Sequence, residues 1–357
     1  MASHRRPKPA GRARVSILTA AAATAVALST QGGAHAGPAP TKDQVKQQVD
    51  QLNEQAEVKT EAYNAAVVKQ QDLQKQVGQL QDQVARQQDR VTTVQDSLAG
   101  IAAEQYRTGG VSQTMQLMLS SSPDAFLGQA GALDQVGSTQ AGLLKSFKTE
   151  QAALDQQRDE AQRKLTELDV TAKALKADKE DIQAKLAKAT DLLNSLTQKE
   201  RDELAAAEAK AAADSRAQAD TAQRASRDES RPDLGAVKAT SGYAGAALAA
   251  ATSKLGSWYS YGAAGPTTFD CSGLMQWAYA QAGVSIPRTS QAQAGAGTRI
   301  GSDISKAQPG DLIIYYGDMH HVGMYVGNGQ VLHAPHTGAQ VRYESATAMP
   351  INTIVRV

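Results

Sequence analysis

Cys271 is the one cysteine of the 357-residue chain, and its sequence context is typical of a reactive thiol. With no second cysteine it cannot form an intramolecular disulfide, so it is either buried and inert or retained for its reactivity. Residues 274–282 have the pattern of a short helix that ends at Gly283. A thiol at the N-terminus of such a helix has its pKa lowered by the helix dipole. The sequence therefore predicts that Cys271 is a nucleophile.

Four of the six histidines lie within 17 residues near the C-terminus, which suits a nucleophilic cysteine because its thiol needs a base. Residues 321–326 and 330–334 have the composition of two short strands. In a regular strand His320 points to the face opposite His321. We therefore predict that His320 is a neighbour of the site, and that His336 lies in a loop at the rim of the cleft.

The turn between these strands decides whether His321 and His333 can meet. With a two-residue turn at 328–329, the two histidines lie on opposite sides of the sheet. With a three-residue turn at 327–329, His333 faces Gly323 and becomes a diagonal neighbour of His321. Catalysis requires the second register. In that register His321 is expected to take the proton of the thiol, and His333 to hold its imidazole in the productive tautomer.

Six short motifs around these residues together resemble the NlpC/P60 family of papain-like cell-wall peptidases. They occur in the order that the family shows, and they extend over about residues 240–357. The motifs are Tyr259-Ser260-Tyr261-Gly262 with Gly265-Pro266, Phe269-Asp270-Cys271-Ser272-Gly273-Leu274, Pro287-Arg288-Thr289-Ser290, Pro309-Gly310-Asp311-Leu312, His321-Val322-Gly323-Met324-Tyr325 and His333-Ala334-Pro335.

The resemblance implies a papain-like endopeptidase that cuts peptidoglycan stem peptides. In this family the bond is typically the one between D-glutamate, linked through its γ-carboxyl, and the diamino acid. By motif position the resemblance implies Cys271 as nucleophile, His321 as base and His333 as the residue that orients it. It also implies a role in substrate binding or site shape for four further residues, which are Tyr259, Asp270, Ser272 and Arg288.

A zinc site made by the four clustered histidines is the alternative that their ligand chemistry suggests. The sequence has no H-E-x-x-H motif, however. Two residues separate His333 from His336, where the lysostaphin-like metallopeptidases have one. We therefore expect no metal and no other cofactor in the reaction.

Two heptad seams precede the motifs and predict the elements that carry the site. The first seam, counted in alternating steps of four and three over residues 45–101, is apolar at 14 of 17 positions. The second seam covers residues 144–196 and has nearly the same length. Equal lengths favour an antiparallel hairpin within residues 37–204, with a tip at about 106–140, over pairing between molecules.

The predicted fold class is α+β, a long antiparallel α-helical coiled-coil hairpin followed by a small papain-like domain. An Ala-rich helical or flexible linker is expected at residues 205–235. The domain is expected at 236–357, with N-terminal helices packed on an antiparallel sheet, because 11 of the 15 aromatic side chains lie from Tyr243 onward. The coiled coil then either restrains or positions an enzyme, or is the working part of a noncatalytic adaptor for the cell wall or the division machinery. The free thiol favours the enzyme.

Residues 1–36 have the pattern of a secretory signal peptide, with five basic residues, an apolar stretch of 14 residues and an Ala-His-Ala site at 34–36. The remaining chain has 32 basic and 36 acidic side chains, so we expect no nucleic-acid partner. No later stretch is apolar enough for a membrane span. We predict a secreted, cell-wall-associated protein that binds peptidoglycan stem peptides. The apolar tip residues, such as Met115 and Phe126, predict a docking patch for a membrane division complex.

Overall fold

The computed structural model describes residues 40–107, 115, 123–229 and 242–357. The predicted signal peptide lies outside these residues, and so do residues 108–114 and 116–122 of the predicted tip. Phe126 lies within a described helix, but its side chain lies outside the description. Among the described helices none is long and apolar enough to cross a membrane.

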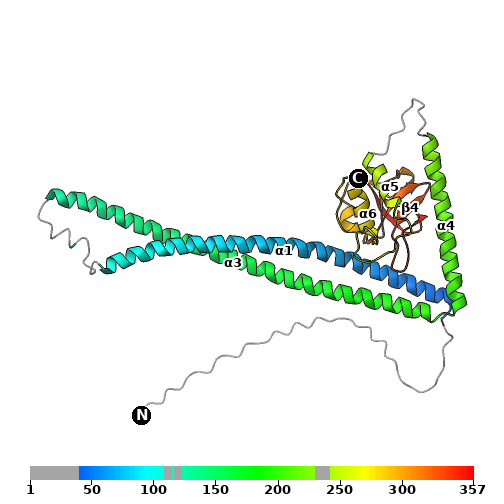
Figure 1. The fold of residues 1–357 in the computed structure, drawn as a ribbon, viewed down its shortest axis with the longest axis horizontal. Coiled ribbons are helices and arrows are strands. Elements are labelled where there is room, and N and C mark those ends of the chain that lie inside the picture. Colours follow the sequence, from blue (N-terminus) through cyan, green and yellow to red (C-terminus); the bar gives the residue numbers. More distant parts are fainter. Residues whose placement is uncertain (1–39, 108–114, 116–122, 230–241) are drawn as a thin grey trace, which may run out of the picture. The chain divides into compact units, whose positions relative to one another are not determined.

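Two long helices, α1 (Lys42–Arg107) and α3 (Pro123–Asn194), pair with each other as an antiparallel hairpin (Figure 1). The heptad seams account for this pairing, because Val45 and Val49 near the start of α1 pack on Ala189 and Leu196 near the end of the second seam. Further along α1, Gln87 donates to the carboxylate of Glu150 over 2.6 Å. The predicted fold class is confirmed, and the hairpin forms within one chain.

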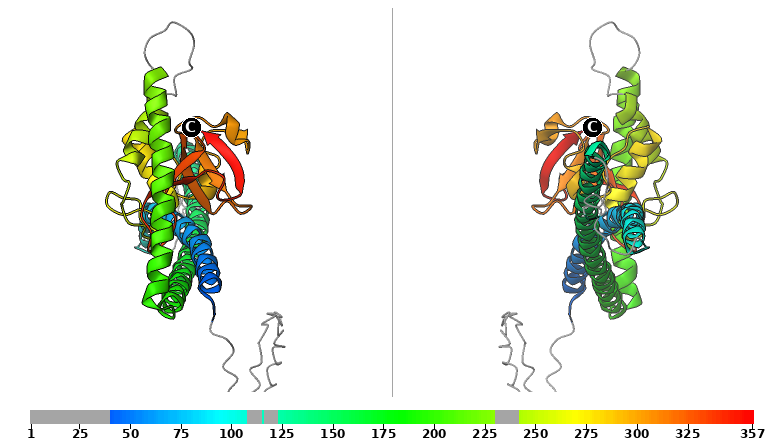
Figure 2. Two further views of the ribbon diagram at one scale, coloured as in Figure 1. Left: turned by 90° about the vertical axis from the view of Figure 1, so that its right-hand side faces the viewer. Right: turned by 90° about the vertical axis from the view of Figure 1, so that its left-hand side faces the viewer.

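A third long helix, α4, covers Gln198–Glu229, so the described part of the predicted linker is fully helical. It begins after a capping box, since the backbone N–H of Glu200 donates to the Thr197 hydroxyl and the backbone N–H of Thr197 donates to the Glu200 carboxylate. The helix packs on the edge of the C-terminal domain (Figure 2), where Glu208 pairs with Arg342. The linker segment is therefore part of the packed structure.

The C-terminal domain consists of short helices and one six-stranded antiparallel sheet with the strand order β1-β6-β2-β3-β4-β5. Apolar side chains of the sheet, such as Leu312, Val322 and Met324, form the main core with Leu274 and Met275 of a central helix. The helices are α5 (Gly242–Thr252), α6 (Cys271–Gln281), α7 (Ser290–Gln293) and η1 (Ile304–Lys306), and the strands are β1 (Thr298–Gly301), β2 (Leu312–Tyr315), β3 (His321–Gly327), β4 (Gln330–His333), β5 (Arg342–Ser345) and β6 (Ile351–Arg356).

Candidate active site

Cys271 is the first residue of α6, at the helix N-terminus where the sequence placed it. The preceding residue, Asp270, caps the helix, because its backbone is extended and its side chain accepts a 2.7 Å hydrogen bond from the backbone N–H of Gly273. The Cys271 side chain is completely buried. A cap, a helix start and a packed helix face thus fix the sulfur in one place.

Strands β3 and β4 have the register that brings the two histidines together, although their turn has only two residues. Gly327 pairs with Gln330 across that turn, and both Asn328 and Gly329 have positive φ angles, of 52° and 69°. A β-bulge before Gly327 then shifts the register by one residue, so that Met324 pairs with Leu332. The three-residue turn that the sequence seemed to require is replaced by a two-residue turn and a bulge.

Gly323 makes room for the contact between the two histidines. A Cβ at this position would lie 2.5 Å from Val331 Cγ2 and 3.1 Å from His333 Cβ, so a side chain here would displace His333. Without one, His321 Nε2 lies 2.8 Å from His333 Nδ1, and both side chains are buried. A ring nitrogen of His321 lies within 4.8 Å of the Cys271 sulfur, and Nδ1 is the nitrogen that His333 leaves unoccupied. The nucleophile, base and orienting residue that the sequence indicated therefore lie in one row.

Glu57 and Glu61, from the first helix of the hairpin, occupy the space in front of this row. A carboxylate oxygen of Glu57 makes a short contact with His321 Nδ1. Glu61 accepts hydrogen bonds from the Ser272 hydroxyl at 2.6 Å and from the backbone N–H of Ser290 at 2.8 Å. Its Oε1 lies 3.7 Å from the Cys271 sulfur. Side chains of α1 therefore fill the position that a substrate would need.

Asn64 completes the contact one turn further along α1. Its amide donates to Asp270 over 3.1 Å, and its carbonyl oxygen accepts from Arg288 over 3.2 Å. Arg288 also pairs with Asp270 over 2.6 Å, and its guanidinium donates to the Ser272 hydroxyl over 2.9 Å. The structure thus brings together Asp270, Ser272 and Arg288, and each of them makes a direct hydrogen bond to a side chain of α1.

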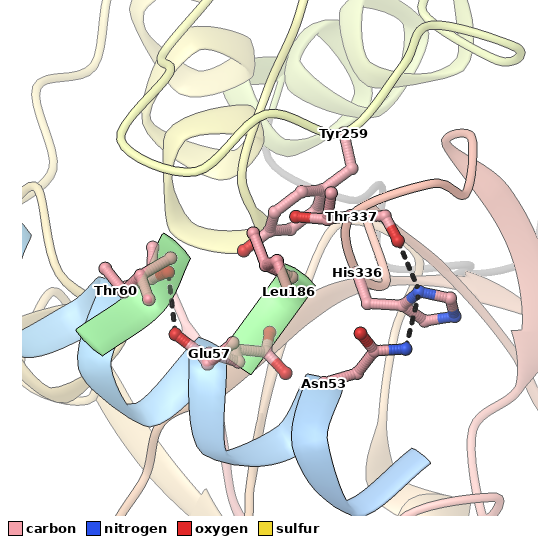
Figure 3. A pocket seen from close by; sticks show the side chains of 9 residues that line it. Asn53, Glu57, Thr60, Leu186, Tyr259, His336 and Thr337 are labelled. Carbon is pink, nitrogen blue, oxygen red and sulfur yellow. Dashed lines mark hydrogen bonds between the residues drawn. The ribbon is translucent and has the colours of Figure 1, made fainter. Parts of the chain in front are cut away.

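Tyr259 lines a small cavity beside the row, and the cavity is closed by the hairpin (Figure 3). Glu57 and Thr60 of α1 face it from one side, and Leu186 of α3 closes another. His336 lies at its rim, where its Nδ1 is 3.3 Å from the Asn53 amide of α1. The loop position predicted for His336 agrees with this arrangement.

The electrostatic environment of Cys271 differs from the one that the sequence predicted. Burial raises the pKa of the thiol well above its usual value, and the carboxylates of Glu61, Glu57 and Asp270 raise it further. Burial, together with the nearby Asp270, also raises the pKa of Glu61. The helix dipole alone would lower the pKa of the thiol, but it is outweighed while α1 is in place. In this conformation Cys271 is a protonated thiol.

His320 lies outside the row of reacting side chains. Its ring stacks on Tyr316 with 4.2 Å between centroids, and its Nδ1 contacts Asp318 over 2.5 Å. Its backbone carbonyl oxygen lies 3.9 Å from the Cys271 sulfur, so it borders the site only through the main chain. The described residues do not bring the four histidines into one metal site. Among them the group with ligand atoms close enough for a metal ion is Glu57, Cys271 and His321.

Sequence analysis missed Glu57, Glu61 and Asn64 of α1, and it also missed Glu344 of β5. The three α1 residues recur at the spacing i, i+4 and i+7, but this polar stripe resembles the solvent-facing stripes elsewhere on the same helix. Glu344 lies 2.9 Å from His333 Nε2. Its alternation with Arg342 on a short strand is a weak signal, and nothing in the sequence pairs it with a particular histidine.

Comparison with known proteins concerns the C-terminal domain alone. Residues 256–355 match the NlpC/P60 family. A probable endopeptidase of Corynebacterium glutamicum is 49% identical over 107 residues, which cover 30% of this chain and 50% of that protein. The probable endopeptidase p60 of Listeria monocytogenes is 50% identical over 100 residues, which cover 28% of this chain and 20% of that protein. This chain therefore spans half or less of the length of these relatives.

A solved structure, the P60 domain of an antigen from Mycobacterium avium subspecies paratuberculosis, is 35% identical to the matched part of this chain. The match covers 32% of this chain and 93% of that structure, with a TM-score of 0.30. The similarity therefore involves almost the whole of that domain and about a third of this protein.

Proposed function

Residues 256–355 of this chain are an NlpC/P60 domain, and on this basis we propose that the protein is a cysteine endopeptidase of peptidoglycan whose α1 helix holds it in a latent state. The observation that carries the proposal is the row of Cys271, His321 and His333. The sulfur lies at a helix N-terminus and within 4.8 Å of a ring nitrogen of His321. A thiol, a base and a second histidine that holds the base are the components of nucleophilic catalysis.

The reaction needs only these groups and water. Nδ1 of His321 takes the proton of the Cys271 thiol, and the thiolate attacks the carbonyl carbon of the scissile bond to form a carbon–sulfur bond. The His321 imidazolium then gives its proton to the leaving amine as the carbon–nitrogen bond breaks. A water molecule, deprotonated by the same imidazole, hydrolyses the thioester and restores the thiol.

The position that the Glu61 carboxylate occupies supports the finer proposal that the bond cut is the D-γ-glutamyl bond to the diamino acid. A glutamate linked through its γ-carboxyl keeps a free α-carboxylate a few bonds from the scissile carbonyl. At this position the Ser272 hydroxyl and the Ser290 backbone N–H donate hydrogen bonds to a carboxylate, and one oxygen of that carboxylate lies 3.7 Å from the Cys271 sulfur. Arg288, which pairs with Asp270, lies near the same position. The helix thus occupies the site with the same functional group as the proposed substrate.

Latency follows from the position of α1. Glu57, Glu61 and Asn64 cover Cys271, and the carboxylates keep its thiol protonated. Substrate can enter only when this part of α1 leaves. A preference of about 1.4 kcal/mol for the covered state already hides nine tenths of the sites.

The test compares full-chain variants on purified peptidoglycan, with the released muropeptides identified by mass spectrometry. Removing both carboxylates with Glu57→Ala/Glu61→Ala is expected to raise the rate of cleavage at least several-fold. Asp82→Ala, at an exposed position further along the same helix, is the control and should cleave at the wild-type rate. The expected products carry a new glutamate carboxyl end and a new amino end on the diamino acid. Equal rates for all three proteins would refute latency, and cleavage at another bond would refute the finer proposal.

A noncatalytic adaptor is the second candidate, because the complete burial of Cys271 would also suit a domain that never reacts. The two candidates differ in the thiol of the opened protein. In the Glu57→Ala/Glu61→Ala variant, an enzyme has a thiol that iodoacetamide alkylates rapidly at about pH 6 to 7, whereas an adaptor has one that reacts no faster than a free cysteine.

Secretion, cell-wall association and a membrane division complex as partner belong to the same proposal, and they rest on the sequence alone. The signal-peptide pattern of residues 1–36 supports export. The docking patch is proposed for the tip of the hairpin. A partner that binds there would act on the site through the length of α1, and export is tested by the N-terminal sequence of the protein recovered from the culture medium.

A further inference from the structure

An ionisable side chain that no sequence motif contains stands behind the two histidines. Glu344 lies on β5, and its Oε2 is 2.9 Å from Nε2 of His333. Strand β5 pairs with β4 so that His333 lies opposite Arg342, and Glu344 is two residues further along the same face. The row of side chains that begins at Cys271 therefore continues through His321 and His333 to a carboxylate.

The contacts along this row fix which ring nitrogens carry protons. Burial lowers the pKa of His333, so its ring is neutral and has one N–H. Nε2 of His333 has no partner of ordinary hydrogen-bond geometry among the described residues, but a nitrogen lone pair 2.9 Å from the Glu344 carboxylate would be repelled, so the proton lies on Nε2, and Nδ1 is an acceptor. The 2.8 Å contact between the rings then requires Nε2 of His321 to donate to Nδ1 of His333. Nδ1 of His321, the atom that faces the thiol, is left unprotonated.

We propose that Glu344 is a positioning residue of the peptidase reaction, which sets the tautomer of His321 through His333 so that Nδ1 of His321 is the base. The inference rests on the proposed function, in which His321 deprotonates Cys271. Glu344 touches neither the substrate position nor the thiol. Its effect passes through His333, which it keeps in the one tautomer that accepts a hydrogen bond from His321.

The surroundings of Glu344 keep it charged for this role. Burial opposes its ionisation, but His333 and Arg342 outweigh burial and lower the pKa of Glu344 to about 2. Arg342 lies 3.6 Å from the same carboxylate and also pairs with Glu208 of α4. One guanidinium is thus shared by two carboxylates, and the docking of α4 holds Arg342 beside Glu344.

The charged and titratable groups around the two rings define the background in which the proposal is tested. His321 faces Glu57, Cys271, Tyr315 and His333. His333 faces His321, Glu344 and Arg342. Glu57 contacts His321 Nδ1 only while α1 is docked, so all variants are made in full-chain protein that carries Glu57→Ala/Glu61→Ala.

The first measurement is the nitrogen-15 NMR spectrum of the histidine rings at about pH 8 in protein that also carries Cys271→Ala, where no thiolate can pair with His321 and imidazoles are neutral. With Glu344 present, His321 and His333 should both give the pattern of a ring protonated at Nε2. Glu344→Ala should turn both into mixtures of the two tautomers. Glu344→Gln should restore the original pattern, because its amide oxygen can still accept from Nε2. The control Asp318→Asn removes a carboxylate from His320 instead and should leave both rings unchanged.

The second measurement is the pH profile of muropeptide cleavage. Glu344→Ala should lower kcat by about 10-fold with KM unchanged, a loss of roughly 1.4 kcal/mol in the barrier alone. Glu344→Gln should recover most of the kcat. In both variants the acid limb of the profile should move to lower pH, because removing a negative charge disfavours the imidazolium.

These outcomes separate the inference from the proposed function. Unchanged tautomers in folded Glu344→Ala protein, or a pH profile that stays in place, overturn the role of Glu344. If the tautomers shift as expected but no variant cleaves peptidoglycan, the tautomer control stands and the proposed function fails. If Glu344→Ala does not fold, Glu344→Met, which fills more of the same space and offers no carboxylate oxygen, takes its place, and unchanged tautomers in that folded protein overturn the role of Glu344.

Discussion

The two halves of α1 bury different kinds of side chain, although they belong to one continuous helix. In the middle of the helix Leu73, Val77 and Leu80 are buried on α3 alone, as a heptad seam requires. Nearer the N-terminus the helix also buries Glu57 and Glu61, on a second face that contacts the C-terminal domain. Both parts of the helix make the hairpin, and the N-terminal part also covers Cys271 and His321.

The difference reflects what each part of α1 contributes to the packing of the helix. Apolar burial is non-directional and stabilises the hairpin in proportion to its area. Burying an unpaired carboxylate raises the free energy of the docked state. Glu57 and Glu61 therefore favour docking of α1 only where they contact His321 and Ser272. The middle part of α1 therefore contributes apolar burial, and the N-terminal part adds a contact that depends on specific polar partners.

The largest expected effect concerns the site that the N-terminal half covers. In the opened Glu57→Ala/Glu61→Ala protein, Cys271→Ala should abolish muropeptide release, with a loss of at least about 10⁴-fold, because no other group supplies the nucleophile. His321→Ala should be nearly as severe. A chelator should have no effect. Loss of activity in EDTA that is restored by zinc would contradict the thiol mechanism and turn attention to the group of Glu57, Cys271 and His321.

Two cavity-creating substitutions in α3 test the comparison between the two parts of α1 directly. Ile182 and Leu154 are both buried in the seam, but Ile182 also lines the cavity at the site. Ile182→Ala and Leu154→Ala should each lower the free energy of unfolding by about 2–5 kcal/mol. Only Ile182→Ala should also speed alkylation of Cys271, because only its cavity loosens the part of the hairpin that covers the thiol. Equal acceleration in both would mean that the hairpin releases the site as one rigid unit.

The pH dependence of docking should be smaller and should have a definite sign. The pKa values of Cys271 and Glu61 are both raised when α1 is docked, so both groups hold protons more tightly in the docked state. Docking is thus fully favoured below their undocked pKa values and weakens as the pH rises, from about 4.3 for Glu61 and, for Cys271, from the lowered pKa that its thiol has at the helix N-terminus of the opened site.

The measurement is the alkylation rate of Cys271 in the wild-type chain divided by the rate in the opened variant, at each pH. This ratio removes the ordinary increase of the thiolate fraction with pH. It should rise toward one between about pH 5 and pH 9, and Glu61→Gln should flatten its acidic part. A ratio that falls with increasing pH would contradict the assigned directions of the two pKa shifts.

The smallest effect is expected far from the site, at Gln87. This buried amide interrupts the seam and donates to Glu150 across the hairpin. Gln87→Leu should change the free energy of unfolding by less than about 1.5 kcal/mol and should leave cleavage and Cys271 alkylation unchanged. A clear change in activity would show that the middle part of α1 also affects the site.

The sequence predicted the parts of the fold that repeat or that a local rule determines. The heptads of α1 and α3 are periodic over many turns, and the Asp270 cap with Gly283 after α6 marks a helix by local chemistry. The contact of His321 with His333 was predicted as conditional on the register. Its cause, a bulge before Gly327, was not visible, because a bulge adds one residue without any distinctive residue type.

Long-range polar contacts could not be predicted in the same way. Glu57 is separated from His321 by 264 residues, and its position on α1 has the same polarity as the solvated positions around it. The same holds for Glu344, whose partner His333 lies on the adjacent strand. Periodicity describes which face of an element is apolar, but the partner of a buried charge depends on tertiary packing.

The covered position of Cys271 also determines how long the protein stays usable before it acts. Peroxides oxidise thiolates much faster than thiols, and the product can pass through sulfenic to irreversible sulfinic acid. With α1 docked the sulfur is buried and protonated, so it has neither the access nor the charge that oxidation needs. Under the proposed latency the helix that delays the enzyme also preserves it, and each molecule becomes vulnerable to peroxide only when α1 leaves the site.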